Sequence, residues 1–264
     1  MSETFMRTEL LLGPEAMEKL APLMDHLARE RVFEELCKLL ISATAEDLRQ
    51  FVPLLTQVIP ELTPSVGFQQ HSPHHRYDVF THTAHVVEAV PKEPALRWAA
   101  LLHDVGKPAC FTMDETGRGH FKGHAKVSAE MADTILLHLK APTALRQQVT
   151  ELIDLHMTKL EPDKKLLRRR LGKLGQERLE QLLTLQEADM GSKGTGQSEE
   201  MEVFEQIRSI LEEIREEDSC LSLKGLAVKG NDLLALGFTG KAIGRTLNTM
   251  LEQVLEEQLP NKKE

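Results

Sequence analysis

Aromatic side chains are scarce in this sequence, making up 4% of its 264 residues, with one Trp and one Tyr. Aromatic and β-branched residues are the ones that strands favour. The chain is rich instead in Leu, Glu, Lys, Arg, Gln and Ala, which are mostly good helix formers. We therefore expect an all-α protein.

Paired cysteines and long apolar runs are also missing. The three cysteines, Cys37, Cys110 and Cys220, are scattered without Cys-x-x-Cys spacing, which argues against a disulfide framework and indicates a reducing compartment. No apolar run approaches the roughly 18 residues of a membrane span. The start, Met1-Ser2-Glu3-Thr4, does not resemble a signal peptide. We expect a cytoplasmic protein without a membrane partner.

Net positive charge is lacking as well, since the formal charge is −9. Such a chain is not expected to coat nucleic acid generally or to bind DNA specifically, although a local basic patch could bind RNA. Residues 159–173 hold seven Lys and Arg against two acidic residues. This run is either a solvated helix face or a contact to an RNA backbone through Arg168, Arg169 and Arg170.

Two further places suit a phosphate group. Arg76, together with His75, lies in a Pro- and His-rich loop over residues 60–77 that runs directly into the next helix. Gly240-Lys241 begins a helix, where free amides and a cation would meet a phosphate. The alternative for Gly240-Lys241 is a glycine-closed helical hairpin, which the sequence supports at least equally.

The stretch Ala99–Pro108, AALLHDVGKP, carries the most specific chemistry. Apolar residues bring His103 and Asp104 side by side to the polar end of a helix, which Gly106 and Pro108 then end. Adjacent side chains on one helical turn lie roughly 100° apart, so both can converge on a single ion. Because a lone His-Asp pair is weak evidence, the question is whether other ligands stand nearby.

The other candidate ligands also stand at helix ends or in first turns. They are His82, one turn into a helix over residues 79–90 that Asp78 can cap; His124, at the entry to a helix over 125–139; His156, at the end of a helix that Thr143 caps; and Asp189, at the end of a helix before Met190-Gly191. Imidazoles together with carboxylates suit Mn, Fe, Co, Ni or Zn, with Mg less suited.

These residues predict one or two divalent ions per chain. His82, His103, Asp104 and Asp189 would complete one site, and His124 and His156 would hold a second ion with Asp104 bridging the two. Two adjacent metal ions clamp a phosphoryl group and generate a nucleophile from a bridging water. Asp104 and Lys107 are then the predicted catalytic residues, with Lys107 neutralising a phosphate oxygen. The sequence contains no P-loop, no Gly-x-Gly-x-x-Gly motif and no Ser-His-Asp or Cys-His arrangement that competes.

The set His82…His103-Asp104…Asp189 resembles the signature of the HD metal-dependent phosphohydrolase superfamily. The segments YDVFTHT (77–83), LLHDVGKP (101–108) and HFKGHAKVSA (120–129) look like the HD region of bacterial tRNA nucleotidyltransferases, which are the CCA-adding enzymes and poly(A) polymerases. RVFEELCKLL (31–40) resembles the helices that follow their polymerase head, and residues 226–244 are similar to their RNA-facing C-terminal part. The resemblance covers about residues 14–259.

The resemblance implies a multi-helix HD-domain fold in three parts. These are a neck-like helical segment (1–60), an HD phosphohydrolase domain (61–195) and a small C-terminal helical region that faces RNA (196–264). The chain lacks the Gly-Gly or Gly-Ser turn and the Asp-x-Asp pair of the catalytic head, so nucleotide addition is not expected of it alone. Met1 favours a stand-alone relative over a fragment.

We therefore expect a metal-dependent phosphohydrolase that acts on nucleotide or RNA-terminal phosphates, as a phosphomonoesterase or cyclic phosphodiesterase. One alternative is a non-catalytic module that binds tRNA or another RNA through Arg168–Arg170 and Lys241. Another is an accessory body subunit of a tRNA nucleotidyltransferase whose head is a separate chain.

Overall fold

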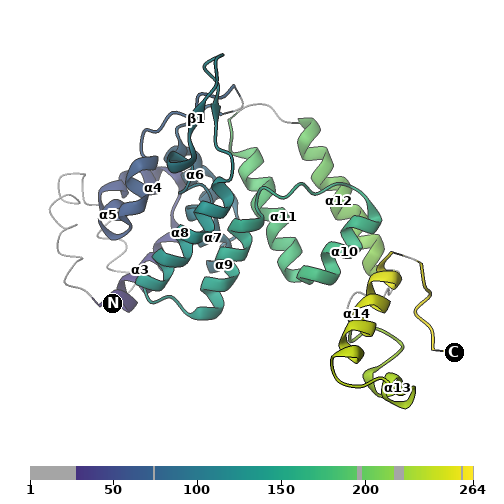
Figure 1. Cartoon of the computed structure of the whole chain (residues 1–264). Coiled ribbons are helices and arrows are strands. Elements are labelled where there is room, and N and C mark those ends of the chain that lie inside the picture. The colour runs from purple at the N-terminus through teal and green to yellow at the C-terminus, as the bar shows by residue number, and fades with distance from the viewer. Residues whose placement is uncertain (1–27, 74, 195–197, 217–222, 257, 264) are drawn as a thin grey trace. The chain divides into compact units, whose positions relative to one another are not determined.

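The computed structural model describes residues 28–73, 75–194, 198–216, 223–256 and 258–263 (Figure 1). The α-helices in these residues are α3 (Arg29–Ser42), α4 (Ala45–Gln50), α5 (Val52–Val58), α6 (Val79–Ala89), α7 (Pro94–Leu102), α8 (His124–His138), α9 (Thr143–Leu155), α10 (Lys164–Leu174), α11 (Gln176–Gly191), α12 (Ser198–Glu216), α13 (Gly230–Ala235) and α14 (Lys241–Leu255). Two short 3-10 helices, η2 (Pro60–Ser65) and η3 (Pro108–Cys110), lie between them.

The predicted all-α fold is confirmed. Among the described residues the strands are β1 (Thr112–Met113) and β2 (Gly119–His120), which pair antiparallel with Thr112 opposite His120. The turn-rich stretch between Phe111 and Gly119, whose residues favour a small hairpin or a loop, forms the hairpin. None of the described helices is both long and apolar enough to cross a membrane.

The chain divides into two compact units. The first comprises the residues up to Thr158 together with Thr184–Gln197, and the second comprises Lys159–Leu183 together with Ser198–Glu264. Helix α11 therefore contributes its beginning to the second unit and its end to the first. All the predicted metal ligands belong to the first unit.

Helix α7 is the centre of the first unit. Every residue from Ala95 to Leu102 is buried, because α3, α6, α8 and α9 all pack against this helix. Figure 1 shows α8 and α9, which also pack on each other, beside it. Trp98, which is fully buried, stacks on Phe33 of α3 with ring centroids 5.5 Å apart. The position of α7 is thus fixed on several sides, which makes its end a rigid place for functional groups.

A buried arginine also ties α7 to α3. Arg97 is 3% exposed, and its guanidinium donates hydrogen bonds to the carbonyl oxygens of Pro91 (3.1 Å) and Leu40 (3.2 Å). These bonds satisfy a charged group that would otherwise be costly to bury. They also satisfy a carbonyl at the end of α3, where the helix itself offers no partner.

In the second unit α10 packs against α12 and α14, and α13 packs against α14. Leu167 and Leu171 of α10 are buried in this unit, as are Ile207 and Leu211 of α12. The helical hairpin named as the alternative for Gly240-Lys241 corresponds to α13 and α14. Helix α12 begins at Ser198.

Candidate metal centre

Helix α6 begins at a cap that also fixes the preceding loop. The Asp78 carboxylate accepts hydrogen bonds from the amides of Phe80 and Thr81, each at 3.1 Å, as the sequence predicted. It also accepts one from the Gly67 amide at 3.2 Å. His82 follows one turn later, is 1% exposed and lies on the inner side of the helix. The cap therefore fixes where α6 begins, and with it the position of the His82 imidazole inside the first unit.

Helix α7 ends at Leu102 and delivers His103 and Asp104 into the interior, where they are 0% and 1% exposed. The next residue but one, Gly106, packs directly on α8, and its amide donates to Ser128 Oγ at 2.9 Å. A Cβ at position 106 would lie 2.8 Å from the Ser128 backbone nitrogen. Only glycine lets the turn after Asp104 approach α8 so closely.

The remaining predicted ligands reach the same place from three other helices. His124 is the first residue of α8, and His156 follows the last residue of α9. Thr143 is the first residue of α9 and not its cap, because Pro142 stands at the cap position. Asp189, in the last turn of α11, lies with its Oδ1 2.9 Å from Nε2 of His82. Five helices thus contribute to one buried cluster.

The four imidazoles present the same nitrogen to the cluster. Nδ1 of His103, His124 and His156 lies 2.6–2.8 Å from a carbonyl oxygen one turn back in its own segment. Nδ1 of His82 lies 3.3 Å from the Ser192 carbonyl oxygen. Because a carbonyl only accepts, Nδ1 carries the proton in a neutral ring and the lone pair is left on Nε2. This is how a protein usually orients histidines that ligate a metal.

We call the set His82, His103, Asp104, His124, His156 and Asp189 the His/Asp cage. Two groups of three within it, His82–His103–Asp104 and Asp104–His124–His156, each bring their ligand atoms within 4.8 Å of one another. Asp104 is common to both groups. Its Oδ1 lies 3.2 Å from Nε2 of His124, and its Oδ2 lies 3.1 Å from Nε2 of His103.

The charges in the cage shift the pKa values of its members. Burial opposes ionisation of Asp104, but His103 and Lys107 outweigh it and hold the pKa of that carboxyl well below its usual range. Burial also opposes ionisation of Asp189, and its contact with Nε2 of His82 holds its pKa low. Burial, reinforced by His103, lowers the pKa of His156 to about 4. Both carboxylates are therefore ionised at neutral pH, and His156 is neutral.

The donor set of the cage fits a divalent cation. Nε2 of His124 and Nε2 of His156 face each other at 3.2 Å, although both carry lone pairs when the rings are neutral. Nε2 of His103 is buried and has no hydrogen-bond partner among the described residues. Buried lone pairs without a donor are unfavourable unless a proton or a cation lies between them. Imidazole nitrogens with carboxylate oxygens are ligands typical of transition metals.

Lys107, predicted to neutralise a phosphate oxygen, is 6% exposed. Its ammonium lies 2.7 Å from Asp104 Oδ2 and donates a hydrogen bond to Gln70 Oε1 at 2.9 Å. It also lies 5.4 Å above the centre of the Phe121 ring. The ammonium is therefore engaged inside the first unit.

Sequence reasoning missed two residues that support the cage. Gln70 is 2% exposed and links Lys107 to the carbonyl oxygen of Tyr77 through a 3.1 Å hydrogen bond from Nε2. Ser192 supplies the carbonyl oxygen that faces His82. Gln70 lies in a polar loop, and Ser192 directly follows the end of α11. Nothing in their local sequence distinguishes them from solvated residues.

The predicted RNA contacts lie in different settings. In the first unit the Arg76 amide donates to the Lys193 carbonyl oxygen at 3.0 Å. In the second unit Arg168 is 7% exposed and belongs to the packed face of α10, while Arg169 pairs with Glu256 at 2.7 Å. Lys241 is exposed at the first position of α14. Arg76 and the cage residues thus belong to the first unit, and Arg168, Arg169 and Lys241 belong to the second.

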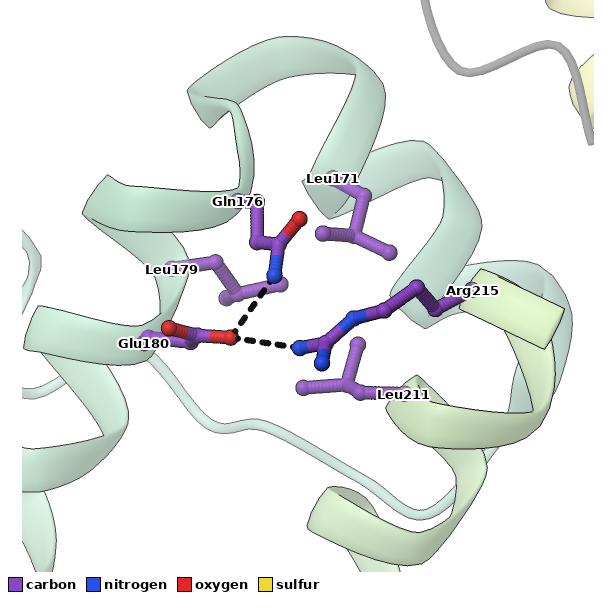
Figure 2. Close-up of a pocket in the computed structure, with 6 residues that line it drawn as sticks. All are labelled: Leu171, Gln176, Leu179, Glu180, Leu211 and Arg215. Carbon is purple, nitrogen blue, oxygen red and sulfur yellow. Dashed lines mark hydrogen bonds and ion pairs between the residues drawn. The ribbon is translucent and has the colours of Figure 1, made fainter. Parts of the chain in front are cut away.

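A pocket in the second unit contains no group of metal ligands among its lining residues. It is lined by Leu171, Gln176, Leu179, Glu180, Leu211 and Arg215 (Figure 2). Glu180 accepts hydrogen bonds from Arg215 at 2.9 Å and from Gln176 at 3.1 Å. Its polar groups thus satisfy one another, and the rest of the lining is leucine, so we regard this pocket as packing between α10, α11 and α12.

The family described as tRNA nucleotidyltransferase domain 2 matches residues 120–264, which include His124, His156 and Asp189 of the cage. The chain belongs to this family. A second family, described as "Probable RNA and SrmB-binding site of polymerase A", matches residues 14–65. That match takes in α3, α4 and α5. The similarity to nucleotidyltransferase body and tail segments predicted from the sequence is thereby confirmed.

Individual relatives agree with this result. The CC-adding tRNA nucleotidyltransferase of Thermus thermophilus is 36% identical over 248 residues, which are 90% of this chain and 55% of the relative. The A-adding tRNA nucleotidyltransferase of Deinococcus radiodurans is 34% identical over 263 residues, which are 93% of this chain and 59% of the relative. The Multifunctional CCA protein of Halorhodospira halophila is 34% identical over 142 residues, covering 51% of this chain. The chain spans between half and three fifths of the first two relatives.

These names correct the expected enzyme class. We expected an HD-domain metal-dependent phosphohydrolase, with no nucleotidyltransferase activity of this chain alone, and this expectation is wrong. The relatives that match nine tenths of the chain are named as transferases. The error arose because a His/Asp cage by itself indicates metal binding, and the step from metal binding to phosphate hydrolysis came from a superfamily signature alone.

Proposed function

We propose that this chain is the tRNA-binding body of a tRNA nucleotidyltransferase. The observation that carries the proposal is the similarity over nine tenths of the chain to a CC-adding and an A-adding tRNA nucleotidyltransferase. The match of residues 14–65 to a family described as RNA-binding supports it independently. In this function the chain holds the tRNA, and RNA binding is the property to test first.

The hairpin of α13 and α14 is the RNA contact that the geometry supports best. Lys241 and Arg245 are exposed on the first turns of α14, and neither has an ion-pair or hydrogen-bond partner among the described residues. Leu236 and Phe238, in the turn before them, are 74% and 37% exposed. Cations suit the phosphates of RNA, and exposed apolar side chains can pack on unstacked bases and riboses.

The basic run on α10 makes a smaller contribution in this proposal. Arg168 is buried and stabilises the second unit, so it does not reach an RNA from its present position. Arg169 would have to break its ion pair with Glu256 in order to bind a phosphate, and Arg170 is half-buried. Both remain proposed contacts, as does Arg76 in the first unit.

We further propose that the His/Asp cage binds a divalent cation. The shared orientation of its four histidines and the two ionised carboxylates support this. A metal ion there would tie together α6, α8 and the ends of α7, α9 and α11. Its effect on the protein is therefore a gain in stability, because an ion that binds only the folded state favours that state.

Charge reversal tests the proposed RNA surface. We expect Lys241→Glu with Arg245→Glu to weaken binding of a tRNA transcript in fluorescence anisotropy. The slope of log K against log salt should fall by about two, one for each phosphate that is no longer neutralised. Lys92→Glu with Lys122→Glu makes the same change in net charge at exposed positions of the first unit. Equally weakened binding in both double variants, or no tRNA binding by the wild type, contradicts the proposal.

A further inference from the structure

The buried ammonium of Lys107 has an unusual position beside a metal-ligand cage. Its side chain is 7% exposed, and its partners are Asp104 Oδ2, Gln70 Oε1 and the face of Phe121. The Lys107 amide also donates to the Asp104 carbonyl oxygen at 2.9 Å, so the turn after α7 brings the side chain back onto Asp104. A lysine this deeply buried requires a counter-charge, and Asp104 supplies it.

The two oxygens of Asp104 therefore have different surroundings. Oδ1 faces His124 at 3.2 Å and His156 at 3.9 Å. Oδ2 faces His103 at 3.1 Å and the ammonium at 2.7 Å, a contact that is an ion pair without hydrogen-bond geometry. An ion that bridged through Oδ2 would have to lie close to a fixed positive charge. Two metal ions in the cage would require Asp104 to bridge them. The ammonium beside Oδ2 makes this bridging unfavourable.

The charge balance of the cage leads to the same result. With its imidazoles neutral, as metal ligands are, its formal charges are the carboxylates of Asp104 and Asp189 and the Lys107 ammonium, which lies 2.7 Å from Asp104 Oδ2. One divalent ion would leave this buried group with a net charge of about one, whereas two ions would leave it with about three. Charges taken out of water are unfavourable unless they are compensated, so the second ion would bind far more weakly than the first.

We propose that Lys107 is a built-in counter-ion that limits the His/Asp cage to one divalent ion and holds the cage together when no ion is bound. The limit to one ion rests on the proposed metal site. The role of Lys107 in the metal-free protein does not, because it rests on the Lys107–Asp104 contact. Lys107 is in this account a positioning residue that acts through Asp104.

The test measures bound Mn²⁺ per chain by elemental analysis and the melting temperature in EDTA. We expect the wild type to bind one ion and Lys107→Met to bind two. We also expect Lys107→Met to melt about 10 °C lower in EDTA, because Asp104 is left buried without its partner. Lys107→Arg keeps the charge and should bind one ion. Lys122→Met, an exposed lysine in the same unit, should match the wild type in both measurements.

The outcomes separate the two proposals. Two ions in the wild type, or one in Lys107→Met, overturn the limit on stoichiometry. An unchanged melting temperature of Lys107→Met in EDTA overturns the counter-ion role. No Mn²⁺ in any variant overturns the proposed metal site and the limit with it, while the melting data still decide the counter-ion role. If Lys107→Met folds only when Mn²⁺ is present, the ion has replaced the missing charge, which supports the counter-ion role.

Discussion

At the scale of single residues, the protein fixes the tautomer of each cage histidine with a backbone carbonyl. For His103, His124 and His156 that carbonyl lies three residues earlier, so the local turn orients the ring. His82 differs, because its carbonyl comes from Ser192, 110 residues away. Three of the four histidines are thus oriented by local structure, and the orientation of the fourth depends on the packing of the whole unit.

Removing one cage histidine tests its role as a ligand. We expect His124→Gln to lower the affinity for Mn²⁺ by about tenfold or more, because Nε2 of His124 is one of the three ligand atoms of the group Asp104–His124–His156. Isothermal titration calorimetry measures the change. His138→Gln is the matched control, since His138 ends the same helix and is exposed. Equal affinities of the two variants would contradict the assignment of His124.

His75 is expected to make the stability depend on pH. It lies against His82, with ring centroids 5.7 Å apart, and its Nδ1 is buried without a hydrogen-bond partner among the described residues. Burial, together with Lys107, lowers the pKa of His75 from 6.5 to about 3. Because the folded pKa is the lower one, the contribution to stability is complete above about pH 6.5 and is lost as the pH falls towards 3.

The corresponding measurement is the melting temperature against pH in EDTA. Unfolding between these pH values takes up about one proton at His75. We expect His75→Gln to show a shallower decline in melting temperature between about pH 6.5 and 4 than the wild type. His138→Gln should keep the wild-type decline. A decline in His75→Gln that matches the wild type would show that this residue is not buried as a neutral imidazole.

At the scale of elements, the cage depends on how closely the turn after α7 approaches α8. A Cβ on Gly106 would lie 2.8 Å from the Ser128 nitrogen and 3.1 Å from the His124 carbonyl oxygen. These are backbone atoms of the first turns of α8, so they cannot move away independently of the helix. The helix that carries His124 would have to shift relative to the one that carries Asp104.

We therefore expect Gly106→Ala to destabilise the protein by about 1–3 kcal/mol in urea unfolding, as overpacking of a core does. The affinity for Mn²⁺ should fall with it, because His124 moves with α8. Gly191→Ala is the control, since a Cβ at this helical position meets nothing within 4 Å. It should leave the stability unchanged or slightly raised. A Gly106→Ala variant with wild-type stability would show that α8 can yield at this point.

The helix ends were the elements most open to prediction from the sequence. Asp78 before an apolar helix, and histidines at the borders of apolar runs, are local signals, and the structure places all six predicted ligands in one cage. The surroundings of Lys107 and Arg168 were not predictable in this way. A lysine after a helix and an arginine in a basic run are solvated by default. Only tertiary packing buries them.

At the scale of the whole molecule, the chain combines a unit that contains the His/Asp cage with a unit that carries the exposed hairpin of α13 and α14. Sequence motifs predicted the helical class and the similarity to tRNA nucleotidyltransferase body segments, because both follow from composition and contiguous motifs. The enzyme class was not predictable, because the same cage can support hydrolysis or a purely structural ion. The names of the relatives specify transferases, and the expectation of a phosphohydrolase is corrected on that ground.

The central claim is that the chain binds tRNA, and its most direct test is a comparison of ligands at one salt concentration. The dissociation constant of the full chain is measured by fluorescence anisotropy for a folded tRNA transcript and for duplex DNA of equal length and charge. The account predicts that tRNA binds tighter than DNA by about tenfold or more. Equal affinity for the two, or no binding of either at low salt, would contradict it.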